Sequence, residues 1–156
     1  MCQYLNFFSF KRTAKTDITV YKVLRKCMKG NDKYDEPMVQ YRSPIKLMIY
    51  NLFALYTATI VRNRNTVDAG LHSFVDEASA KEYINRNFLP YNHVVAKGII
   101  PKGGKYYKSK QMLCGSEIDV YYVGGYVSDS LILTEILSTN APSEPVDYKF
   151  LSHYVE

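Results

Sequence analysis

Short runs of alternating β-branched and aromatic residues, separated by turn-forming residues, recur along this chain of 156 residues. Residues 18–24 read Ile-Thr-Val-Tyr-Lys-Val-Leu, a pattern that predicts a strand. Residues 93–100 predict a second strand, because Pro101-Lys102-Gly103-Gly104 follows them and favours a turn. Residues 118–123 and 131–137 predict two more strands on either side of Gly124-Gly125. We therefore expect a mostly antiparallel sheet.

One helix is predicted at residues 76–87. Asp76 and Glu77 suit the positive end of the helix dipole, and Ala80, Tyr83 and Ile84 form an apolar stripe. Ser73 is a candidate cap for this helix. Together with the strands, the helix gives an α+β fold with one or two helices.

Three other segments complete the expected organisation. Residues 30–44 carry Gly, Asn, Asp and two Pro, which predicts a loop. Residues 47–61 are apolar and are interpreted as core, either a buried helix or two strands, with a β-branched finish that favours strand at the end. Residues 1–137 are expected to form a single globular domain, and residues 138–156, with two prolines, an irregular tail.

The charge and the cysteines limit the kind of protein. The net charge of +5 favours contact with an anionic partner, and fifteen Tyr and seven Phe without Trp supply rings with hydroxyl groups. Cys2, Cys27 and Cys114 are odd in number and have no metal-ligand spacing, so we expect a reducing compartment, the cytoplasm, with neither a disulfide framework nor a metal. We expect no membrane span, because the apolar run is shorter than a bilayer-crossing helix.

Two basic clusters are the strongest candidates for binding. The first contains Lys22, Arg25, Lys26 and Lys29, and the second contains Lys102, Lys105, Lys108 and Lys110 around Tyr106 and Tyr107. Ammonium groups beside aromatic rings can hold a phosphate chain and stack a base. The simpler interpretation of the second cluster is a solvated hairpin whose lysines discourage edge-to-edge aggregation.

Isolated reactive side chains give little evidence for a catalytic or metal site. His72, His93 and His153 have no metal-ligand spacing, although His72 precedes the predicted helix and could serve in acid–base chemistry. Cys27 has basic neighbours that would lower the pKa of a thiol, but no histidine accompanies it in the sequence. The sequence therefore contains no complete catalytic signature.

Three segments nevertheless resemble ADP-ribosyltransferase-like domains in their order. They are Val20-Tyr21-Lys22-Val23-Leu24, Gly70-Leu71-His72-Ser73-Phe74 before a helix, and the strand Ser130-Leu131-Ile132-Leu133-Thr134-Glu135-Ile136. The resemblance implies bound NAD, with Lys22 as the basic NAD-binding residue and Ser73 as the middle serine. It implies Glu135 or Glu117 as the carboxylate that stabilises an oxocarbenium-like ribose.

A second resemblance is to small proteins of Bacteroidota phages and prophages. The Met1-Cys2 start, the segment Val-Tyr-Lys-Val-Leu, the turn Gly-Leu-His-Ser-Phe and the segment Ile-Pro-Lys-Gly-Gly-Lys-Tyr-Tyr carry it. It implies a protein that binds a host component, such as a CRISPR or nucleotide-signalling defence system.

The leading hypothesis is therefore a non-enzymatic, phage-encoded binding protein without a cofactor. Its basic, Tyr-rich surfaces would engage a host protein or protein–nucleic acid complex, a nucleic acid or a nucleotide in the host cytoplasm. The alternatives are an NAD-using ADP-ribosyltransferase-like enzyme and an assembly protein that forms a homodimer through exposed tyrosines.

Overall fold

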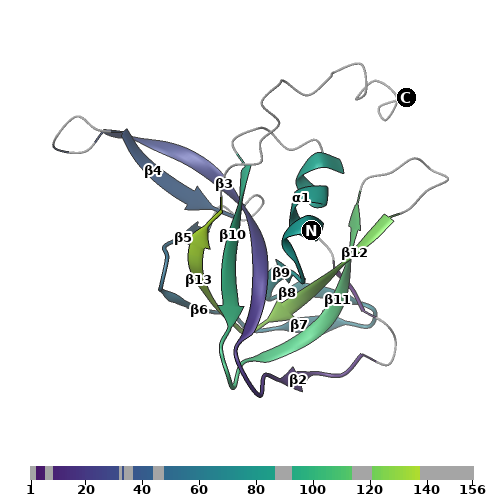
Figure 1. Ribbon diagram of the computed structural model, residues 1–156. Helices are drawn as coiled ribbons and strands as arrows, with labels where there is room; N and C mark the ends of the chain where they lie inside the picture. The colour runs from purple at the N-terminus through teal and green to yellow at the C-terminus, as the bar shows by residue number, and fades with distance from the viewer. Residues whose placement is uncertain are drawn as a thin grey trace.

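The computed structural model describes residues 3–5, 9–31, 33, 37–43, 48–86, 93–113 and 121–137. These residues form one helix and a sheet of thirteen strands, and every strand pair among them is antiparallel (Figure 1). This described part of the fold is thus mostly β with a single helix, which confirms the predicted antiparallel sheet. The strands are β1 Gln3–Tyr4, β2 Arg12–Thr13, β3 Ile18–Asn31, β4 Pro37–Arg42, β5 Ile49–Tyr50, β6 Leu55–Thr57, β7 Val61–Asn63, β8 Thr66–Ala69, β9 Leu71–Phe74, β10 His93–Ile100, β11 Lys105–Leu113, β12 Tyr121–Ser128 and β13 Ser130–Ile136, and α1 is Glu77–Arg86.

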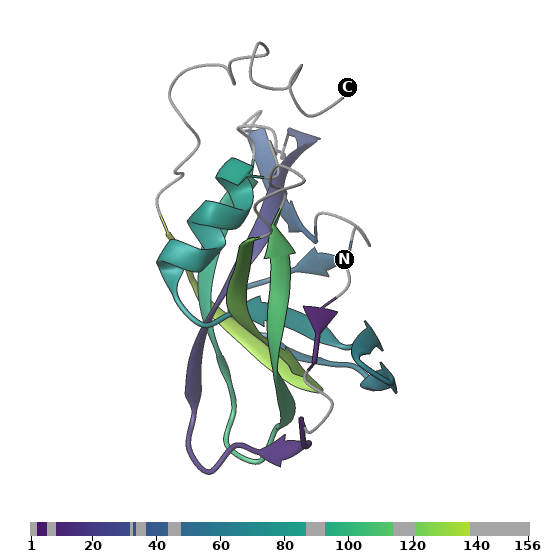
Figure 2. The same cartoon turned by 90° about the vertical axis from the view of Figure 1, so that its right-hand side faces the viewer.

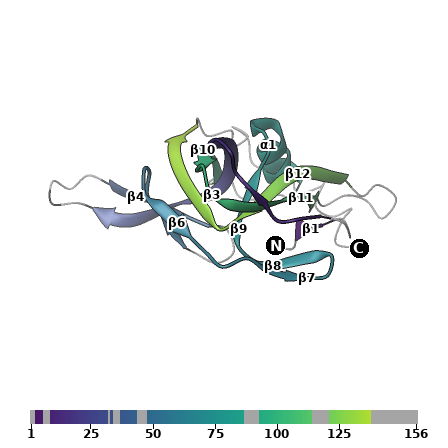
Figure 3. The ribbon, with the colours of Figure 1, turned by 90° about the horizontal axis from the view of Figure 1, so that it is seen from below.

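The two end strands of the sheet follow each other directly in the chain. Its strand order is β6-β13-β10-β3-β9-β12-β11-β1-β8-β7, with β2, β4 and β5 attached beside this path. The end strands β6 and β7 are separated in the chain only by residues 58–60. Residues 55–63 therefore pair with β13 through their first part and with β8 through their last (Figure 3).

Alternation along β3 gives the sheet two buried faces. Val20 and Leu24 point to the inner face, where they pack with residues such as Leu131 and Leu133 of β13. Val23 points to the opposite face and packs against α1. The cluster between sheet and helix also contains Phe74, Ala80, Tyr83, Ile84 and Val95. The helix thus covers one face of the sheet, as Figure 2 shows.

The helix is confirmed within one residue of the predicted start, but its cap differs from the prediction. The carboxylate Oδ1 of Asp76 accepts the hydrogen bond of the Ser79 backbone N–H at 2.7 Å, so Asp76 is the cap. Ser73, the predicted cap, lies within β9, and its side chain is buried. Asn87, the predicted last helical residue, lies outside the described residues.

The turn expected at 70–74 is strand β9 from Leu71 to Phe74, and two predicted boundaries were also wrong. The predicted loop at 30–44 contains β4, and β3 extends to Asn31, so a long two-stranded ribbon replaces most of it. Gly124 and Gly125 do not end a strand, because β12 continues through them to Ser128. The turn lies instead at Asp129, between β12 and β13. Composition was misleading in both places, since pairing with a long neighbouring strand outweighs weak local propensity.

The strand predicted at the end of the apolar run 47–61 is only partly present, because residues 56–57 and 61 are strand and residues 58–60 are not, and most of the run is not core. It contains β5, β6 and the first residue of β7. Tyr50 is buried, whereas six large apolar side chains of the run are exposed: Met48, Ile49, Leu52, Phe53, Leu55 and Val61. Leu47 and the tail 138–156 lie outside the described residues.

Gly98 is required by a close approach between β10 and β13. A Cβ at this position would lie 2.4 Å from the carbonyl oxygen of Ile132 and 3.1 Å from the Cα of Leu133, both backbone atoms. We expect Gly98→Ala to lower the free energy of unfolding by about 2–4 kcal/mol, measured by urea denaturation, because the two strands must separate locally. Gly103→Ala is the control: its φ of 89° imposes strain but its Cβ meets nothing within 4 Å, so a loss of about 1 kcal/mol is expected. Equal losses in the two variants would contradict the close approach.

Candidate functional site

The second basic cluster is divided by the alternation of β11. Lys105, Lys108 and Lys110 are exposed, whereas Tyr106 is half-buried and Tyr107 is buried. The ring of Tyr107 packs with Leu5, Val67 and Val127, and the guanidinium of Arg62 lies 5.4 Å from its centroid. Strand pleating therefore separates Lys108 and Lys110 from this ring, which the sequence analysis had grouped with them.

A groove on one face of β11 and β12 brings the exposed lysines to other aromatic rings. Lys108 lies opposite Tyr126 and Lys110 lies opposite Gly124, and opposite residues of antiparallel strands share a face. These residues line a groove of about 360 Å³ together with Val75 and Tyr122. We call it the Lys/Tyr groove and define it by Val75, Lys108, Lys110, Tyr122, Gly124 and Tyr126.

Each side chain of the groove has a distinct environment. Tyr122 is 51% exposed, so much of its ring is accessible to a ligand. Tyr126 packs edge-on against Tyr106, with 5.7 Å between the ring centroids. Burial, and to a lesser extent the neighbouring Tyr106, raises the pKa of Tyr126, so its phenol stays neutral and can donate a hydrogen bond at physiological pH.

Gly124 lines the base of the groove, where it leaves space because it has no side chain. A Cβ at this position would lie 3.1 Å from a methyl carbon of Val75. The backbone N–H of Val75 donates to the carbonyl oxygen of Gly124 at 3.2 Å, which holds the segment between β9 and α1 against β12. The groove therefore combines two ammonium groups, a half-exposed ring and a glycine at its base.

The first basic cluster does not form one surface. Lys22 is 7% exposed, and its Nζ donates to the carbonyl oxygen of His72 at 2.6 Å. The same Nζ lies 5.2 Å from the centroid of the Tyr50 ring, a cation–π geometry, and burial raises the pKa of Tyr50. Arg25 is exposed and pairs across the sheet with Arg42 and His93, while Lys26 is half-buried. The side chain of Lys29 lies outside the described residues.

A row across the inner face connects Lys22 with the Lys/Tyr groove. Ala96 lies opposite Lys22, Ser73 opposite Tyr126, and Tyr126 opposite Lys108. The pairing of Tyr21 with Phe74 places Lys22 beside Ser73, because the next residues of the two strands then face each other. The hydroxyl of Ser73 is buried and has no hydrogen-bond partner among the described residues. Polar groups thus extend from the groove into the inner face.

Glu135 does not join this row. It is exposed and lies opposite Lys97, which lies opposite Tyr21, on the face of the sheet that carries α1. Lys22 and Ser73 are therefore side by side, but Glu135 projects from the other face of the sheet. Glu117, the other carboxylate implied by the ADP-ribosyltransferase resemblance, lies outside the described residues.

The remaining candidates are scattered. Lys102 is exposed in the turn after β10, and the Nζ of Lys105 donates to the hydroxyl of Thr13 at 2.5 Å. Cys27 is half-buried and free, and His93 is buried.

Within the described ranges there is no group of three or more His, Cys, Asp or Glu side chains that could hold a metal ion. No helix in these ranges is long and apolar enough to span a membrane.

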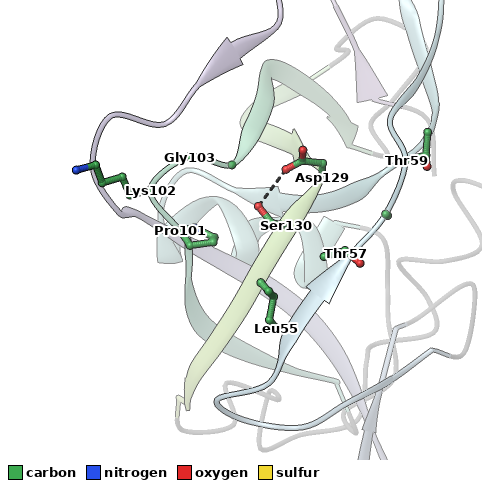
Figure 4. A pocket seen from close by; sticks show the side chains of 10 residues that line it. Leu55, Thr57, Thr59, Pro101, Lys102, Gly103, Asp129 and Ser130 are labelled. Carbon is green, nitrogen blue, oxygen red and sulfur yellow. Dashed lines mark hydrogen bonds between the residues drawn. The ribbon is translucent and has the colours of Figure 1, made fainter.

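A second, shallow depression of about 650 Å³ lies where β6, the start of β13 and the turn after β10 meet (Figure 4). Asp129 accepts hydrogen bonds there from the backbone N–H of Lys105 at 2.8 Å and from the hydroxyl of Ser130 at 3.0 Å. This carboxylate is thus engaged in holding the turn.

Tyr122 and Tyr126 were absent from the sequence-based candidates. Both lie in the segment Tyr-Tyr-Val-Gly-Gly-Tyr at 121–126, whose alternation would have placed them on one face had the strand been continued through the glycines.

Comparisons with known proteins identify no relative. No protein-family model matches the chain, and neither the curated proteins nor the solved structures contain a match.

Proposed function

We propose that this protein is a non-enzymatic binding protein whose Lys/Tyr groove engages an anionic partner that carries phosphates and bases. The observation that carries the proposal is the exposure of Lys108 and Lys110 on the same face as the half-exposed ring of Tyr122. Ammonium groups attract phosphates, and an exposed ring offers a base a stacking surface. A net charge of +5 strengthens the attraction at longer range.

The biological partner we propose is a component of a host defence system, either a nucleic acid-containing complex or a nucleotide signal. Support for it comes from the resemblance to small phage and prophage proteins and from the chemistry of the groove. Of the two carboxylates that the resemblance to ADP-ribosyltransferase-like domains implies, Glu135 lies on the face of the sheet opposite to Lys22 and Ser73, which favours binding over ADP-ribosyl transfer through Glu135.

Tyr122 provides the first test. We expect Tyr122→Ala to raise the Kd for a fluorescein-labelled single-stranded oligonucleotide about five- to a hundredfold, because stacking of one base contributes about 1–3 kcal/mol. Tyr122→Phe is the control, since it keeps the ring and should bind within about twofold of the wild type. Fluorescence anisotropy measures the Kd of the wild type and of both variants. Wild-type affinity in Tyr122→Ala would remove the ring from the site, and failure of the wild type to bind would exclude this ligand class.

A further inference from the structure

A row of two arginines and a histidine crosses three neighbouring strands. His93 of β10 lies opposite Arg25 of β3, and Arg25 lies opposite Arg42 of β4 (Figure 1). Directly opposite residues leave the sheet on the same face, with their Cβ atoms about 5 Å apart. This is the face that carries α1, because Val23 and Val95, two residues away along β3 and β10, pack with the helix. Arg25 is exposed, so the cover of the helix ends before the row.

The guanidinium of Arg42 is held in a fixed orientation. The side-chain oxygen Oε1 of Gln40 accepts hydrogen bonds from its Nε at 3.2 Å and from its Nη2 at 2.8 Å. Both bonds use one edge of the planar group, so Nη1 on the other edge can donate to a ligand.

The two arginines have no acidic partner within the described ranges. The carboxylates that form ion pairs there are Glu77 and Glu82, and both pair with cations of α1 itself. Like charges directly opposite each other destabilise a pair of strands. An anion between Arg25 and Arg42 would therefore remove a repulsion that the fold leaves in place.

We propose that Arg25 and Arg42 form a binding site for a phosphate monoester, separate from the Lys/Tyr groove. A phosphate monoester carries nearly two negative charges at neutral pH and has three acceptor oxygens. A guanidinium binds such a group with two parallel hydrogen bonds, so two guanidiniums match it both in charge and in donors. A carboxylate or an internal phosphodiester of a nucleic acid carries a single charge and fits the pair less well.

The test is an NMR titration of the ¹⁵N-labelled protein with inorganic phosphate at constant ionic strength. The backbone amides of Arg25 and Arg42 and the Nε–H signals of their side chains should shift to saturation. Arg25→Gln should raise the Kd at least about tenfold, because charged hydrogen bonds are lost. Arg12→Gln is the matched control, since Arg12 is exposed on β2, which pairs with β11, and its Kd should stay within about twofold of the wild type.

Folding of the variant is checked separately. Because Arg25 is exposed and faces a like charge, Arg25→Gln should unfold at the same urea concentration as the phosphate-free wild type or at a higher one. Titrations with phosphotyrosine and with AMP distinguish a phosphorylated side chain from a nucleotide as the source of the phosphate. Binding of either, with a higher Kd in Arg25→Gln, supports the site.

Shifts at Arg25 and Arg42 that do not saturate would overturn the proposal. So would equal losses of affinity in Arg25→Gln and Arg12→Gln, because phosphate would then respond only to net charge. An oligonucleotide without terminal phosphates separates this site from the groove: Arg25→Gln should bind it as tightly as the wild type, since Arg25 does not line the Lys/Tyr groove. Weaker oligonucleotide binding in Arg25→Gln would contradict a separate site.

Discussion

Reversing the charge of Lys108 and Lys110 together is expected to lower the affinity for a single-stranded oligonucleotide by at least about tenfold. Each lysine that contacts a phosphate releases a counterion, so the slope of log Kd against log salt concentration should also fall by about two. The reason is geometric: β11 places both ammonium groups in the Lys/Tyr groove, on the face that Tyr126 and Gly124 share. Fluorescence anisotropy at several salt concentrations measures both effects.

The control for this variant is Lys11→Glu with Lys15→Glu. Both lysines are exposed and lie outside the groove, and the change in net charge is the same. We expect this control to lower affinity only slightly, through the weaker long-range field. If both double variants lost affinity equally, the net charge would account for binding and the groove would have no special role.

Removing Leu24 is expected to have the largest effect on stability. Its side chain is 0% exposed and packs in the inner cluster of the curled sheet. Leu24 lies on β3, which pairs with β10, a strand distant in the sequence. Leu24→Ala should lower the free energy of unfolding by about 2–5 kcal/mol, because it removes buried methyl groups and leaves a cavity. Urea denaturation followed by circular dichroism measures the change.

Leu52→Ala is the matched control, because Leu52 is 39% exposed and the substitution is identical. We expect a loss below about 1 kcal/mol. A loss in Leu24→Ala as small as that of Leu52→Ala would contradict the inner face as the main core.

The elements that the sequence predicted are those whose local pattern and long-range pairing agree. The start of β3, β10, α1 and β13 combine a clear periodicity with flanking turn residues, and all four are present. The strands β8, β9 and β11 were not predicted, and neither were those at 37–42 and 124–128. The last two contain Pro or Gly and exist because a long neighbouring strand pairs with them. The periodicity of a single sequence gives no information about which strands pair.

The site was predicted in part for the same reason. Lys108 and Lys110 follow directly from the basic cluster, but the aromatic residues beside them depend on the register between β11 and β12. The neighbours in sequence, Tyr106 and Tyr107, are half-buried and buried, and Tyr122 and Tyr126 take their place across the groove. Likewise, Lys22 was expected among surface charges, but strand alternation turns it to the inner face.

The uncharged run at 47–61 shows how composition can suggest the wrong environment. An apolar segment normally predicts burial, but here the run contributes to the two end strands of the sheet, β6 and β7, and much of it is exposed.

The most direct measurement is a chemical-shift map of the ¹⁵N-labelled protein titrated with the single-stranded oligonucleotide. The backbone amides of residues 108–110 and 122–126 should show the largest changes, and those of β4 and β6 should change little. Changes centred on Arg25, Lys26 and β4, or spread evenly over all exposed lysines, would contradict binding in the Lys/Tyr groove.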